Sequence, residues 1–235
     1  MNCKRYKSIA FAVVGSLAIM IPGMTYAKNS KNTPYEVWGS DQSNSVPGGD
    51  VGTDGSFIWV WNSEDMEKQI NMGKMAEPMG CDPANTPGAG PCDLKEVFPA
   101  SLVQDDGIGP TGDTLGDLPK FGKLHGMLPD PQNLYMNVNS FVTGGGYVGI
   151  MDGRTKEAVA LFRVTQVSAG SQRSVHMSFW NNDGSALLIA NLHGKILERI
   201  DLTRDANGNI TNANFNRAAS LGVGRAQVII EDATA

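Results

Sequence analysis

The feature that most constrains the fold of this chain is a pattern that occurs twice between Lys120 and Val223. Each copy opens on a histidine, His125 in the first and His176 in the second, and these are 51 residues apart. An apolar run, a polar turn and a run of β-forming residues that ends in asparagine follow each histidine. A glycine and a second β-forming run, which ends near an aspartate, complete each copy. Several short strands in each unit are therefore predicted.

A period of about 40–50 residues with several strands in each unit is typical of a β-propeller blade. We therefore expect an all-β fold with four-stranded blades at about 35–75, 120–166 and 173–223, and a further strand at 226–232. Three blades and one strand do not close a ring, because propellers have about four blades or more. The chain is expected to be the N-terminal part of a longer protein. The alternative is self-association, which would cover the open blade edge.

The first 27 residues have the composition of a secretory signal peptide. Lys4, Arg5 and Lys7 precede an apolar run at 9–21. Thr25 and Ala27 are small residues at the two positions that a signal peptidase reads, so cleavage is expected after Ala27. That run has about 13 residues, whereas a helix that spans a bilayer needs about 20. We expect a mature domain of residues 28–235, in the periplasm or outside the cell, with no membrane span.

The charge balance excludes two classes of partner. Signal removal takes away three positive charges and no negative ones, which changes the formal net charge from −5 to −8. Because the chain also lacks a cluster of lysine and arginine, we expect neither nucleic acid nor an anionic membrane surface as a partner. Its 28 glycines and its low charged content, 18%, suit a turn-rich β protein.

Cys81 and Cys92 lie in a segment rich in proline and glycine. Two cysteines this close in an exported protein predict a disulfide. A metal-binding or redox pair is the alternative, but the spacing is not that of a redox motif and no histidine lies nearby. The surrounding segment, 76–116, is interpreted as an irregular insertion between blades, with a short helical turn at 94–102 its one regular element.

Part of the first copy resembles the repeats of exported YVTN-type β-propeller proteins. The residues that carry the resemblance are His125-Gly126, Pro129-Asp130, Leu134-Tyr135, Asn137, Tyr147-Val148, Asp152, Arg154-Thr155 and Val159-Ala160. These proteins are similar in style to the quinoprotein amine dehydrogenase β-chain and to the propellers of nitrite and nitrous oxide reductases. The resemblance implies the fold but says little about activity.

The second copy contains a sharper resemblance. The segment from His176 to Phe179, followed by Gly184 and Ala186, is similar to a copper-ligand segment of nitrous oxide reductase, and His125-Gly126 resembles another. The resemblance implies that both histidines face the propeller axis and lie close enough to share copper or haem iron. The alternative is that both are blade-core residues that hydrogen-bond a neighbouring strand. His193 is expected to lie elsewhere.

Two functions remain open from the sequence. The first is a binding or scaffold module that holds a protein or a small molecule on one face of the propeller. The second is a metal- or cofactor-dependent redox protein that uses His125 and His176. The sequence contains no nucleophile elbow, phosphate loop or zinc-protease helix, so it assigns no catalytic residue.

Overall fold

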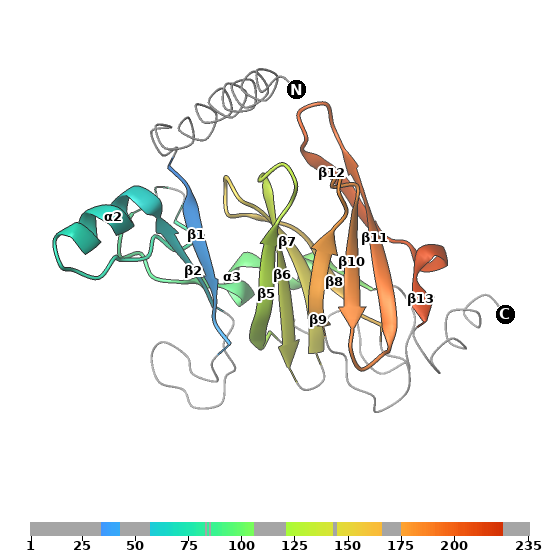
Figure 1. Ribbon diagram of the computed structural model, residues 1–235. Helices are drawn as coiled ribbons and strands as arrows, with labels where there is room; N and C mark the ends of the chain where they lie inside the picture. Colours follow the sequence, from blue (N-terminus) through green and yellow to red (C-terminus); the bar gives the residue numbers. More distant parts are fainter. Residues whose placement is uncertain are drawn as a thin grey trace, which may run out of the picture. The chain divides into compact units, whose positions relative to one another are not determined.

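The computed structural model describes residues 34–42, 57–82, 84, 86–105, 121–142, 145–165 and 175–222 (Figure 1). All of the helices and strands named below belong to one compact unit, residues 36–235. The expected signal peptide and the expected strand at 226–232 lie outside the described residues. Within these residues the fold is mostly β, and no helix is long and apolar enough to cross a membrane.

The first sheet has three antiparallel strands in the order β1-β2-β3. They are β1 (Glu36–Ser40), β2 (Phe57–Asn62) and β3 (Cys92–Asp93). The run that forms β2 suggests a strand buried on both faces, but its burial alternates. Ile58 and Val60 are fully buried, whereas Trp59 and Trp61 are half-buried and stack on each other with ring centroids 6.4 Å apart.

An α-helix that the sequence analysis did not predict follows β2. This helix, α2 (Ser63–Asn71), begins where the Asn62 side chain accepts a hydrogen bond from the Glu64 N–H at 2.8 Å. It ends before Gly73, whose positive φ of 69° suits glycine. No residue of α2 is buried. Because the helix covers no core, its sequence lacks the apolar stripe by which helices are usually recognised.

The second sheet is a four-stranded antiparallel meander with one added strand. Its strands are β5 (Lys123–Pro129), β6 (Tyr135–Val142), β7 (Gly145–Asp152) and β8 (Ala158–Arg163). A short strand, β4 (Val103–Asp105), pairs in parallel with β8 at the outer edge. The third sheet is a similar meander. It contains β9 (Val175–Trp180), β10 (Ala186–Asn191), β11 (Ile196–Arg204) and β12 (Ile210–Phe215), and β13 (Leu221–Gly222) pairs with β11.

The segment interpreted as an irregular insertion is more ordered than expected. It contributes β3 to the first sheet and β4 to the second. Between them lie α3 (Leu94–Val97) and a 3-10 turn (Ala100–Leu102), so the predicted helical turn at 94–102 is confirmed. The two strands were not predicted, because they are two and three residues long and show no alternation that a sequence pattern could reveal.

The first turns of the two meanders make the same hydrogen bonds. In each, the residue that opens the turn donates its N–H to the carbonyl five positions on and accepts from the N–H three positions on. The opening residues are Asp130 and Asn181, and the residues three positions on are Asn133 and Gly184, with φ of 57° and 70°. Each pair is separated by the same 51 residues as the two histidines.

The second sheet is buried on both faces (Figure 1). One apolar cluster joins it to the first sheet and includes Ile58, Val60, Leu94, Phe98, Val138 and Leu161. Another joins it to the third sheet and includes Val148, Ile150, Phe162, Leu187, Ile189 and Ile200. The opening strands are also in contact, β1 with β5 and β5 with β9. The contact between β5 and β9 brings the two histidine-bearing strands together.

Gly149 of β7 leaves the space that a buried aromatic ring occupies. A Cβ at this position would lie 2.4 Å from Cζ of Phe98, which is 1% exposed and sits directly after α3. We expect Gly149→Ala to lower the free energy of unfolding by about 1–3 kcal/mol, because a packed core accommodates extra volume poorly. Urea denaturation measures this change. The double variant Gly149→Ala/Phe98→Leu should lose less stability than the sum of the losses in the two single variants. Strict additivity would contradict the contact.

Candidate functional site

The structure brings His125 and His176 together. His125 belongs to β5 of the second sheet and His176 to β9 of the third, and their ring centroids are 4.4 Å apart with 42° between the ring planes. His176 is exposed and His125 is partly buried, so solvent reaches the pair. His193 belongs to the turn between β10 and β11, apart from these two strands.

Each of the two histidines sits at a break in strand register. The residues on either side of His125 pair with two successive residues of β6, Ser140 and Asn139, and the register skips the histidine itself. The residues on either side of His176 pair in the same way with two successive residues of β10. A residue inserted in this way forms a β-bulge, which redirects its side chain and is frequent beside functional sites. The repeat pattern predicts that the two positions are equivalent, but it contains no signal for the bulges.

Two side-chain amides hold the backbone of the first bulge. The Gln42 side chain donates a hydrogen bond from Nε2 to the His125 carbonyl at 3.0 Å. The Asn139 side chain donates from Nδ2 to the next carbonyl, that of Gly126, at 2.8 Å. Because two consecutive carbonyls accept hydrogen bonds, the backbone that carries the His125 side chain is held in place.

A buried polar network lies next to the pair and joins β6 to β9. Asn137 donates from Nδ2 to the carbonyl and hydroxyl of Ser178 at 2.7 and 2.9 Å, and the Ser178 hydroxyl donates to Asn139 Oδ1 at 2.6 Å. All three side chains are fully buried. Because a buried polar group is costly when it loses its partner, this network fixes the position of β9 against β6. Asn137 was noted in the sequence, but nothing there indicated Ser178 as its partner.

A second set of polar contacts joins the same two sheets at the turn ends of their strands. Arg204 Nη2 pairs with the buried Asp130 carboxylate at 2.9 Å, and its guanidinium lies over the rings of Tyr135 and Trp180. Trp180 also donates from Nε1 to the Leu128 carbonyl at 3.0 Å. The partly buried Trp180 therefore contributes to the contact between the second and third sheets.

Arg154 adds a further contact between these turns. It donates to Asp152, to the Tyr135 hydroxyl at 3.2 Å and to Asn209 Oδ1 at 3.0 Å. The hydrogen bond from Arg154 keeps the pKa of the Asp152 carboxyl below its usual value, although partial burial acts in the opposite direction. Asn209 ends the hairpin turn between β11 and β12, and the Asn207-Gly208 pair in this turn is a sequence typical of tight hairpins.

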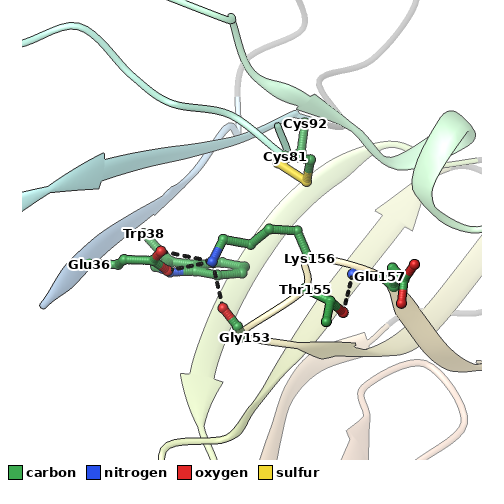
Figure 2. The surroundings of a disulfide bond; sticks show 8 residues. All are labelled: Glu36, Trp38, Cys81, Cys92, Gly153, Thr155, Lys156 and Glu157. Carbon is green, nitrogen blue, oxygen red and sulfur yellow. Dashed lines mark hydrogen bonds and ion pairs between the residues drawn. A yellow bond between two sulfur atoms is a disulfide. The ribbon is translucent and has the colours of Figure 1, made fainter. Parts of the chain in front are cut away.

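The first sheet is tied to the second by a buried ion pair (Figure 2). The Lys156 ammonium lies 2.7 Å from the Glu36 carboxylate and 5.1 Å from the centre of the Trp38 ring. The Lys156 side chain is 3% exposed, and it also donates to the Gly153 carbonyl. The predicted disulfide between Cys81 and Cys92 is formed nearby, with Cys92 in β3.

The spacing of the histidine pair suits copper better than haem. Neutral imidazole is a common ligand of copper, zinc and iron. A haem iron between the two rings would hold their nitrogen atoms about 4 Å apart. The ring centroids would then be farther apart than the nitrogen atoms. The observed centroid separation of 4.4 Å leaves no room for that arrangement. Among the described residues, no group of three or more His, Cys, Asp or Glu side chains could hold a metal.

Comparison of the chain with models of known protein families found no match, and comparison with curated proteins also found none.

Proposed function

We propose that this chain forms blades of an exported β-propeller and works as a binding module, and that His125 and His176 together bind a copper ion. The disulfide supports export, because disulfides form and persist in oxidising compartments. A periplasmic or extracellular location and removal of residues 1–27 belong to this proposal. Two four-stranded meanders, whose opening strands contact each other, support the propeller architecture.

The single observation that carries the copper proposal is the approach of the two imidazole rings. Two bulges, one on each of two strands, turn the histidines to the same place. Inter-sheet contacts on either side of the pair, through Ser178 and through Arg204, hold the strands that bear it. Ligands held on rigid strands bind a metal with little loss of conformational entropy.

The test is a copper titration of the full chain with three matched histidine variants. We expect His125→Ala and His176→Ala each to weaken Cu(II) binding at least tenfold, in competition with a chelator of known affinity. His193→Ala should bind as the unchanged protein does, because His193 lies in a different turn. Nitrogen hyperfine coupling in the electron paramagnetic resonance spectrum should indicate two imidazoles. Equal effects of all three variants, or no binding at all, would refute the copper site.

A second candidate function is a scaffold that binds a protein or a small molecule without metal. The observation that favours it is Phe179, a large apolar residue of β9 that is 52% exposed. Exposed apolar side chains of this size often mark contact surfaces. If the titration finds no copper, this reading predicts that Phe179→Ser leaves stability within about 0.5 kcal/mol of the original protein. Partner capture would then depend on that residue.

A further inference from the structure

A methionine sulfur lies at the junction of the two histidine-bearing strands. Met177 follows His176 in β9 and is only partly buried. Its side chain crosses to β5 and packs on Gly126, the residue after His125. A Cβ added to Gly126 would lie 2.5 Å from the Met177 sulfur and 2.9 Å from its terminal methyl carbon. The thioether therefore occupies the space that the missing Gly126 side chain leaves.

This placement puts the thioether on the same two strands as the imidazoles. Met177 is adjacent in sequence to one histidine, and its sulfur touches the residue adjacent to the other. Two imidazoles alone do not distinguish copper from zinc or nickel, whereas a thioether is a soft ligand that favours Cu(I). The three flexible torsions of a methionine allow its sulfur to move a short distance when an ion enters.

We propose that Met177 is a third ligand of the histidine pair and makes the site selective for Cu(I). This inference rests on the proposed copper function and adds to it the oxidation state of the ion. Gly126 has a positioning role in the site, because any side chain there would displace the sulfur. A site with two imidazoles and one thioether holds Cu(I) more firmly than Zn(II), which the thioether does not favour.

The competing explanation is that Met177 only fills space. Met127 provides the matched control, because it is a partly buried methionine of β5 that packs against the apolar cluster between the first and second sheets. Leucine replaces methionine with little change of volume, so both substitutions should be tolerated by the fold. Only the replacement at 177 removes the sulfur that lies beside Gly126.

The experiment measures Cu(I) and Zn(II) affinity of the full chain under anaerobic conditions, with a coloured Cu(I) chelator and a zinc chelator as competitors. Met177→Leu is expected to weaken Cu(I) binding at least tenfold and to change Zn(II) binding less than threefold. Gly126→Ala should weaken Cu(I) binding in the same direction. Met127→Leu should match the original protein for both ions. X-ray absorption at the copper edge should show a sulfur neighbour that Met177→Leu loses and Met127→Leu keeps.

The outcomes separate this inference from the proposed function. If the original chain binds Cu(I) with two nitrogen neighbours and Met177→Leu binds it equally well, the methionine is a packing residue and the inference is wrong. If His125→Ala and His176→Ala also leave binding unchanged, the copper function itself is wrong. Equal losses in the Met177 and Met127 variants would point to a general loss of packing and would overturn the ligand role.

Discussion

Replacement of Glu36 by glutamine is expected to lower the free energy of unfolding by about 3 kcal/mol, although glutamine has nearly the same shape. The reason is the position of its partner. The Lys156 side chain is 3% exposed, and Glu36, 26% exposed, supplies its carboxylate partner at 2.7 Å. Glutamine removes the negative charge, so the buried ammonium keeps only uncharged neighbours such as the Gly153 carbonyl and the Trp38 ring (Figure 2). Equilibrium denaturation in urea at neutral pH measures the loss.

The control for this prediction is Glu157→Gln, next to Lys156 in the sequence. Glu157 is exposed, so the same chemical change should alter stability by less than about 0.5 kcal/mol. The difference between the two variants should persist at high salt, because buried pairs are screened less than exposed ones. A loss below about 1 kcal/mol for Glu36→Gln would show that the ion pair does not hold the first sheet to the second.

Removal of the disulfide by Cys81→Ala/Cys92→Ala is expected to cost about 3–4 kcal/mol. Closing a loop with a sequence separation of 11 restricts the unfolded chain, which the loop-entropy model values at about 3 kcal/mol. Cys92 is also 2% exposed and packs in the cluster between the first and second sheets, so its truncation removes apolar contacts. Urea denaturation of the double variant measures the loss.

Reduction provides the control for the disulfide. A reducing agent should destabilise the original protein by a similar amount and leave the double alanine variant unchanged. Because β3 carries Cys92 and pairs with β2, amide exchange should rise first in these two strands. A reducing agent that leaves the original protein equally stable would contradict a stabilising role.

Local chemistry explains what could be predicted about the fold. The cysteine pair, the Asn-Gly hairpin before Ile210 and the helical turn at 94–102 all depend on residues close in sequence. The helix α2 has local signals in the Asn62 cap and in Gly73 after its end, but it was not predicted because no residue of it is buried and it lacks the apolar stripe of a core-facing helix. The strands β3 and β4 are stable only because β2 and β8 are already there to pair with them.

The candidate site could likewise be predicted only in part. The repeat placed His125 and His176 at equivalent positions, 51 residues apart, and their imidazoles suggested a metal. The bulges, the Met177 sulfur on Gly126 and the link from Asn137 to Ser178 involve contacts between two sheets. A single sequence contains no signal for such contacts, because the side chains that make them are of ordinary types at ordinary positions.

Sequence patterns alone predicted the β-rich character of the fold and the disulfide pair. The first follows from periodicity and turn residues, and the second from two cysteines that lie close together in a chain with the features of an exported protein. The separation of 4.4 Å between the rings of His125 and His176 arises from tertiary packing. That distance depends on how β5 packs against β9. The packing is set by buried side chains that lie far apart in the sequence.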